Sequence, residues 1–441
     1  MNLRITTITL SLFLLILNVS AQVNDTLHLN QAVALALKNN YDISLAADEA
    51  KVAGINNVPG SVGMLPRLDL SGTRSLSINN SHQQYYDGRT RDGKNAKTNS
   101  QNAGIQLSWT FFDGMNMFIQ KDKLNEMEQL SNIQLRSVVE NTVALVITGY
   151  YNIVVQQKLA NVYHEALLIS LDRQKLAKAG FELGSGSELA YLQSTVDMNA
   201  DSANYIKQLA VVENAQAGLN QLLCRDLKTS FAVDEEIPLD SNLVYDDIWN
   251  KVQQQSPSLL EARGSSDLAA LAVKEVKSSL YPTLSLNSGY NYNKSASDVG
   301  IYTLNRNLGF TVGVTLNYNI FNGFDTRRKL SIARIQEESA KKDEQRVKLD
   351  IEANLQQVFN DFKTNLQLVT FDEGNIQFAK HNFSVAQEKY RLGTITDVEL
   401  RETQQKLMDA ENSLLNSYFL CKSAEVELLR ISGQLTGDTG N

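Results

Sequence analysis

Residues 104–114 read Gly-Ile-Gln-Leu-Ser-Trp-Thr-Phe-Phe-Asp-Gly, and residues 313–323 read Gly-Val-Thr-Leu-Asn-Tyr-Asn-Ile-Phe-Asn-Gly. The two stretches share their glycine ends and their alternation of apolar and polar residues, and they lie 209 positions apart. Leu183-Gly184 and Leu392-Gly393 are separated by the same 209 positions. A constant offset between matching segments indicates that the chain contains two copies of one structural unit.

The matching continues toward the N-terminus with a different offset. Leu65–Leu70 resembles Tyr281–Leu286, and Asn39–Asp42 corresponds to Gln255–Ser258, in both cases 216 positions apart. The offset therefore falls by seven between the two strand-like segments of each copy, where a hairpin loop tolerates a change of length. After the second strand the spacing is equal in both copies, which indicates a rigid element whose two versions end at the same level.

Period-two alternation predicts four strands, at residues 65–78, 103–113, 281–293 and 307–321. One face of each strand is apolar and the other is rich in Ser, Thr and Asn rather than in Lys and Glu. The apolar stretches run for about 9–12 residues, close to the length of a membrane-spanning strand. Four aromatic residues suit the girdles found at membrane interfaces: Trp109, Tyr290, Tyr292 and Tyr318. The strands of a soluble sandwich alternate too, so the strands alone leave that alternative open.

Four strands are too few to close a membrane barrel, since the smallest outer-membrane barrels have about eight. An open sheet edge in lipid would leave backbone N–H and C=O groups without partners. A membrane location therefore requires the chain to oligomerise. Three copies would supply twelve strands, an even number within the observed range.

The segments that lead to the two Leu-Gly pairs contain no proline, and apolar residues recur in them every three and four positions. This pattern predicts coiled-coil-like helices of about 65 residues, roughly 100 Å long. Each Leu-Gly pair predicts a chain reversal, because glycine suits the left-handed cap that follows a helix. Ser187 and Thr396 are then expected to cap the returning helices. The expected helices are 115–180 and 187–224 in the first copy and 324–390 and 396–430 in the second; first helices at 30–58 and 247–278 precede the strands.

The N-terminus has the features of a secretory signal peptide. One basic residue near Met1 is followed by the apolar run Ile5–Leu17 and by Val19-Ser20-Ala21, whose small residues suit a cleavage site. No later stretch of about 18 apolar residues predicts a transmembrane helix. The predicted parts are a signal peptide (1–21), a first repeat (22–224), an acidic linker (225–246), a second repeat (247–430) and a C-terminal tail (431–441).

The composition excludes several classes of function. The chain of 441 residues has a net charge of −8, which disfavours nucleic-acid binding. Its four histidines are scattered without metal-ligand spacing, and we find no phosphate-binding loop or nucleophile elbow. The two cysteines, Cys224 and Cys421, are expected to lie too far apart for a disulfide. We therefore expect neither an enzyme nor a cofactor.

Two copies of helix, strand pair, long helix, glycine turn and returning helix resemble the TolC-like outer-membrane efflux family. The resemblance covers nearly all of the chain after residue 21. Its most specific segments are Leu29–Asn40, the strand ends that close in Phe-Asp/Asn-Gly, and Tyr390–Val398. It implies a mainly α, internally duplicated fold in which four strands per chain complete a twelve-stranded trimeric barrel. That barrel would stand on a long periplasmic α-helical coiled-coil tunnel, with residues 225–246 as its equatorial linker.

The resemblance also implies partners and sites. A periplasmic adaptor of an inner-membrane pump would contact the helix tips at Leu183, Gly184, Leu392 and Gly393. The family closes its tunnel near these tips with charged residues, for which Asp397 is the best positional match. Further gate candidates lie close by: Glu188, which is the repeat-mate of Asp397, and Arg391, Glu399 and Arg401. Solvated charges at a helix end are the alternative explanation, since an N-terminal Asp is favoured by the helix dipole.

The resulting hypothesis is a homotrimeric exit duct in the bacterial outer membrane. It would pass solutes passively from a periplasmic adaptor and an inner-membrane pump of a tripartite efflux or type I secretion system. The alternative is a soluble periplasmic coiled-coil scaffold or adhesin with no channel. Such a wide aqueous tunnel would take its selectivity for cargo from the pump.

Overall fold

The computed structural model describes residues 26–435, so the predicted signal peptide and the end of the predicted tail lie outside the described residues. The described chain forms two compact units. The first takes the residues up to Leu45, Arg136–Pro257 and the residues from Asp350 onward; the second takes Ala46–Leu135 and Ser258–Leu349. Each unit contains parts of both repeats, so the compact units are not the two sequence repeats.

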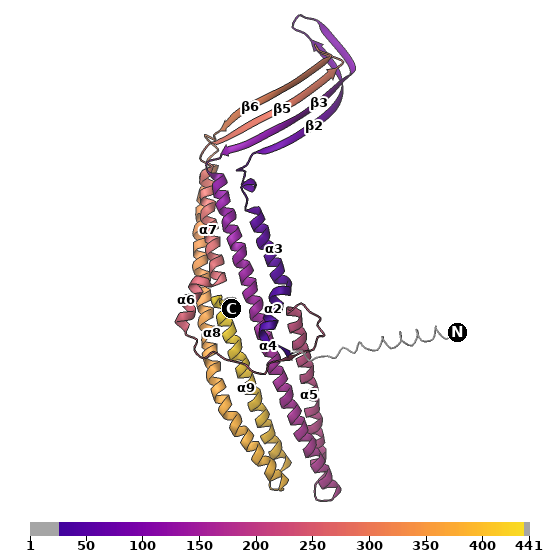
Figure 1. The fold of residues 1–441 in the computed structure, drawn as a ribbon, viewed down its shortest axis with the longest axis vertical. Coiled ribbons are helices and arrows are strands. Elements are labelled where there is room, and N and C mark those ends of the chain that lie inside the picture. The colour runs from indigo at the N-terminus through magenta and orange to yellow at the C-terminus, as the bar shows by residue number, and fades with distance from the viewer. Residues whose placement is uncertain (1–25, 436–441) are drawn as a thin grey trace, which may run out of the picture. The chain divides into compact units, whose positions relative to one another are not determined.

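The second unit contains one antiparallel sheet in the order β2-β3-β5-β6 (Figure 1). Its strands are β2 (Arg67–Gln84), β3 (Thr90–Phe112), β5 (Thr283–Ser297) and β6 (Leu304–Asn317). The register aligns apolar residues across the sheet, as in the row Leu70–Ile105–Tyr290–Phe310. Leu70 is 81% exposed and Phe310 67% exposed, so this apolar face covers no core of the chain. The outer edges of β2 and β6 have no partner strand among the described residues.

The first hairpin differs from the prediction. The first strand was expected to stop near residue 78 and the second to begin near residue 103, with a hairpin loop between them. Instead β2 and β3 stay paired up to Gln84 and Thr90, and only five residues connect them. This polar ribbon was missed because it has no apolar row, so the alternation used to find strands is absent from it. The second hairpin also has longer pairing and a shorter loop, and β6 ends at Asn317 rather than at residue 321.

Two long helices dominate the described chain, α4 (Asn116–Glu182) and α8 (Asp325–Arg391), and each has 67 residues. They are followed by the returning helices α5 (Glu188–Leu222) and α9 (Asp397–Ser432). The Ser187 side chain accepts a hydrogen bond from Ala190 N and that of Thr396 from Glu399 N, as expected for N-caps. One window of α4 has a mean hydropathy of 1.4, enough for a membrane span by composition, but 56% of it is buried as in a core helix.

The expected single helix before each strand pair is split in two. The pieces are α2 (Leu29–Asn39) and α3 (Tyr41–Asn56) in the first copy, and α6 (Tyr245–Gln255) and α7 (Pro257–Ser278) in the second. At the first break the Asn40 backbone is extended, and its side-chain oxygen accepts from Asp42 N and Ile43 N. At the second break Pro257 prevents Ser256 from staying helical. A short 3-10 helix, η1 (Pro59–Val62), follows α3.

A main core of the first unit lies around the predicted equatorial linker. There β1 (Thr26–Leu27) pairs in parallel with β4 (Ala232–Val233), and this short pair packs on α4. Tyr150 of α4 is 1% exposed, and its hydroxyl contacts the Leu27 carbonyl at 2.9 Å and Asp234 N at 2.9 Å. Cys224 and Cys421 are free thiols.

Candidate functional site

The two helix turns have the same backbone geometry. Gly184 and Gly393 have φ values of +74° and +73°, the left-handed conformation that favours glycine after a helix. Gly184 N donates to Phe181 O, and Ser185 N donates to Gly180 O across the same turn. The neighbouring Leu183 and Leu392 are 83% and 76% exposed. Each turn therefore presents an apolar side chain on a rigid tip, as a docking surface would require.

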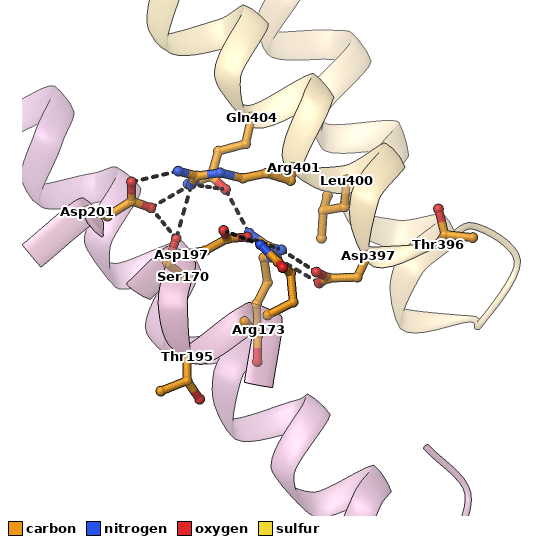
Figure 2. A network of polar contacts seen from close by, with 12 residues as sticks. Ser170, Arg173, Thr195, Asp197, Asp201, Thr396, Asp397, Leu400, Arg401 and Gln404 are labelled. Carbon is orange, nitrogen blue, oxygen red and sulfur yellow. Dashed lines mark hydrogen bonds and ion pairs between the residues drawn. The ribbon is translucent and has the colours of Figure 1, made fainter. Parts of the chain in front are cut away.

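Behind the turns, the buried Arg173 of α4 joins two other helices (Figure 2). Its guanidinium donates two hydrogen bonds to the Asp397 carboxylate of α9, at 3.0 and 2.5 Å. It also donates to Asp197 of α5 at 3.2 Å. The Arg173 side chain is only 3% exposed, and those of Asp197 and Asp397 are 15% and 14% exposed. This is a desolvated, bidentate ion pair rather than a surface contact.

A second arginine completes the network from the opposite side. Arg401 of α9 donates to both carboxylate oxygens of Asp201 of α5, at 2.6 and 2.8 Å. The Asp201 side chain is 1% exposed and also accepts from the Ser170 hydroxyl. Its hydrogen bond to Arg401 raises the pKa of that guanidinium. The Gln404 side chain lies between the arginines, accepting from Arg401 at 3.3 Å and donating to Ala166 O at 3.1 Å.

The network connects the first helical hairpin (α4 and α5) to α9 of the second. Three carboxylates face two guanidiniums, so its formal charge is −1. Removing one partner from a buried pair of this kind costs about 3–5 kcal/mol, because the other charge stays buried. An apolar cluster of Phe383, Ala386 and Leu400 packs beside it against Ile169 and Tyr390. Burial, followed by the nearby Asp397 charge, raises the pKa of Tyr390.

The structure brings two of the five gate candidates together in this network, Asp397 and Arg401. Glu399 instead forms a capping box with Thr396, whose backbone N–H lowers the pKa of the Glu399 carboxyl. Arg391 forms an exposed pair with Glu388 on its own helix, at 3.2 Å. Glu188 is exposed in the first turn of α5.

Sequence reasoning missed Arg173, Asp197, Asp201, Ser170 and Gln404. A signal was present in the heptad spacing of buried polar residues, since Ser194, Asp201 and Gln208 recur every seven positions on α5. Charged or polar residues in the core row of a coiled coil mark a specific pairing. The repeat did not reveal the network, because the position 209 residues after Arg173 is Asn382. The ion pairs therefore form in one arrangement and not in its repeat.

The network holds helices together and gives no indication of catalytic chemistry. Its carboxylates are engaged by guanidinium groups. Within residues 26–435, no group of three or more His, Cys, Asp or Glu side chains has the geometry of a metal site.

Comparison with known proteins identifies relatives over nearly the whole chain. The family model described as outer membrane efflux protein matches residues 32–225 and 248–434, once in each repeat. The outer membrane protein TolC of Vibrio cholerae serotype O1 is 25% identical over 187 residues, which span 42% of this chain and 43% of that protein. The toluene efflux pump outer membrane protein TtgC of Pseudomonas putida is 22% identical over 418 residues, spanning 92% of this chain and 82% of TtgC.

Solved structures show the same fold. The Campylobacter jejuni CmeC outer membrane channel superposes with a TM-score of 0.78 at 18% identity, covering 92% of this chain and 85% of CmeC. The open state of the Neisseria gonorrhoeae MtrE outer membrane channel gives a TM-score of 0.74 at 13% identity, with 94% and 91% covered.

Proposed function

Because the chain belongs to the outer membrane efflux protein family, we propose that three copies of it form a passive exit duct that serves a periplasmic adaptor and an inner-membrane pump. The chain is an outer-membrane efflux protein with a TolC-like, internally duplicated fold, and its helical part lies in the periplasm. The family consists of channels rather than enzymes. The predicted alternative of a soluble scaffold or adhesin loses its support once the family is known.

The four-stranded sheet, with its unpaired edges, is the feature that supports a trimer. Its four strands expose an apolar row on one face, and the edges of β2 and β6 have no partner strand among the described residues. Lipid cannot satisfy unpaired backbone groups, so β2 of one copy would pair with β6 of the next until the wall closes. Three copies complete twelve strands with Ser, Thr and Asn side chains lining a water-filled interior.

The tips supply the contact with the adaptor in this proposal. Leu183 and Leu392 stand exposed beside glycines whose backbone is held by the end of the preceding helix. Exposed apolar side chains on a pre-organised turn bind a partner without a large ordering cost. The adaptor would contact Leu183-Gly184 and Leu392-Gly393.

The buried ion pairs supply the gate. Arg173 with Asp397 and Arg401 with Asp201 fasten α9 to the first hairpin close to the turns. Opening the duct would require these contacts to separate, and adaptor binding would favour the separated state. The other three gate candidates, Glu188, Arg391 and Glu399, lie outside this ion-pair network. The proposal therefore rests on Asp397 and Arg401.

Single-channel conductance in planar bilayers tests the gate. Arg173→Ala and Arg401→Ala should each raise the conductance of the resting channel, because a buried carboxylate loses its partner and the helices separate. Glu188→Gln is the matched control, since it changes the repeat-mate of Asp397 outside the network. Resting conductance equal to wild type in both arginine variants, with trimers present, would remove the network from the gate.

A further inference from the structure

The β2–β3 hairpin extends well beyond its neighbours in the sheet. Pairing of β3 with β5 stops at Thr98 and Ser297, whereas β2 and β3 remain paired as far as Gln84 and Thr90. We call residues 79–97 the arm and residues 298–303, which connect β5 to β6, the loop. A two-stranded ribbon is only marginally stable in water by itself. The arm therefore needs further contacts to keep its shape.

Those contacts come from the loop. The Arg91 guanidinium donates to the backbone oxygens of Gly300 and Asp298, at 3.0 and 2.9 Å. At the base of the arm, Lys97 N donates to the Asp298 carboxylate at 3.0 Å, and Asp298 N donates to Lys97 O at 3.0 Å. Arg91 thus clamps the arm to a segment more than 200 residues away in the sequence.

The loop contacts one particular face of the arm. Strand alternation places Ala96 on the same side of β3 as Thr98, the polar side opposite Ile105 and Leu107. On that side the Thr98 hydroxyl contacts the Ser297 hydroxyl at 3.0 Å. Val299 continues this row and is 9% exposed, and Ala96 is 8% exposed. The loop is therefore packed on the face of the sheet that would line the water-filled interior.

Close packing fixes this contact. A Cβ atom added to Gly93 would clash with Val299 Cγ2, so the glycine makes room for the loop. The ladder is irregular between Asn79 and Ser81, where Asn95 adopts a φ of +54° and its N–H donates to the Asn80 side chain at 2.8 Å. Such bulges bend a strand and change the direction of its remaining residues. Figure 1 shows the far end of the hairpin turning away from the line of the strands.

We infer that the arm and the loop form an inward-folded cap that narrows the outer mouth of the duct and excludes large solutes from outside. This inference rests on the proposed function, because only a closed ring of three copies has an interior. In such a ring, three loops occupy part of the outlet, and the Arg91 clamp holds each one there. The cap is distinct from the ion-pair network at the helix turns.

Accessibility of a cysteine inside the duct tests the cap in intact cells. Gln106→Cys places a thiol on the polar face of β3, below the arm, with the unsubstituted chain as the control for Cys224 and Cys421. Labelling from outside is compared for a small membrane-impermeant thiol reagent and for a maleimide carried on a long polyethylene glycol chain. With the cap intact, the small reagent should react and the polymer should react far more slowly.

Two changes should abolish this discrimination. Replacing residues 80–95 by Asn-Gly connects Asn79 to Ala96, which are already paired, through a favoured hairpin turn. Arg91→Ala removes the clamp alone, and Arg89→Ala on the exposed turn is its matched control. In the shortened chain and in Arg91→Ala, the polymer should then label Gln106→Cys nearly as fast as the small reagent does. In Arg89→Ala, labelling by the polymer should remain slow.

An engineered disulfide between the arm and the loop should restore the contact that Arg91→Ala removes. The Cβ of a residue at position 93 would lie 3.6 Å from that of Val299, a distance typical of disulfides. Adding Gly93→Cys with Val299→Cys to Arg91→Ala should restore exclusion of the polymer. Equal polymer labelling with and without the arm would overturn the cap. Failure of the small reagent in every variant would instead contradict the duct itself.

Discussion

At the residue scale, single side chains join segments that the sequence keeps far apart. Tyr150 connects α4 to β1 and to Asp234, which directly follows β4, and Arg173 connects α4 to α5 and α9. Tyr150 lies within the long helix that the sequence predicts at residues 115–180. Its hydroxyl contacts could not be predicted, because Leu27 and Asp234 lie 123 and 84 residues away. Asp397 and Arg401 were found through family resemblance, whereas their partners depend on how three helices pack.

Tyr150→Phe should lower the free energy of unfolding of the detergent-solubilised protein by about 1–2 kcal/mol, since the Asp234 N–H loses a buried acceptor. Burial raises the pKa of Tyr150 to about 12 from its ordinary 10. The unfolded chain releases this proton first, so the stabilising contribution is complete below pH 10 and declines as the pH rises toward 12. Denaturant titrations of wild type and variant should converge over that range. A constant difference up to pH 12 would contradict the assignment.

At the element scale, helices and turns followed from local signals. Periodicity, the lack of proline and the Leu-Gly pairs predicted α4, α5, α8 and α9 to within two residues at each end. The breaks at Asn40 and Ser256 were underestimated, because apolar spacing continues across them. The arm could not be predicted, since its stability comes from Arg91 contacts 207 and 209 residues along the chain. Sequence patterns within one element do not reveal contacts that the element makes with a distant segment of the chain.

The glycine turns provide a prediction at this scale. Apart from the adjacent residues, no atom lies within 4 Å of a Cβ added at Gly184 or Gly393, so a substitution there meets backbone strain and no steric clash. Valine at either position costs about 1–3 kcal/mol in the left-handed region and should reshape the tip. Export of a pump substrate should fall while trimers persist in the outer membrane. Gly374→Ala, within α8, should leave export unchanged, and normal export in both valine variants would exclude the tips from adaptor contact.

At the scale of the whole molecule, the two copies of the duplicated unit are equal in some lengths and unequal in others. The two long helices have 67 residues each, so the two copies match in helix length. Their β-hairpins, in contrast, differ in length. The sequence offsets already showed which distance is held constant and which is free. The trimer itself was not derivable from one chain, apart from the need of four strands for further partners.

Adjacent positions on β6 test the orientation of the assembled wall. Phe310 lies on the apolar face and Thr311 on the polar face. Phe310→Arg should destabilise the folded trimer in lipid vesicles by about 2–4 kcal/mol if the residue faces the bilayer midplane. Thr311→Arg should be tolerated, because its side chain points into water. Equal loss of heat-resistant trimer on gels for both variants would argue against a lipid-facing side.

The presence of Asn382 where the repeat would require a second Arg173 has a consequence for symmetry. Three copies would arrange six turns of one backbone shape in a ring, alternating between the Gly184 and the Gly393 kind. The backbone of that ring would be approximately sixfold symmetric, whereas the buried ion-pair network would have only threefold symmetry. Opening the trimer would therefore have to release three copies of the network, one within each chain, and not six.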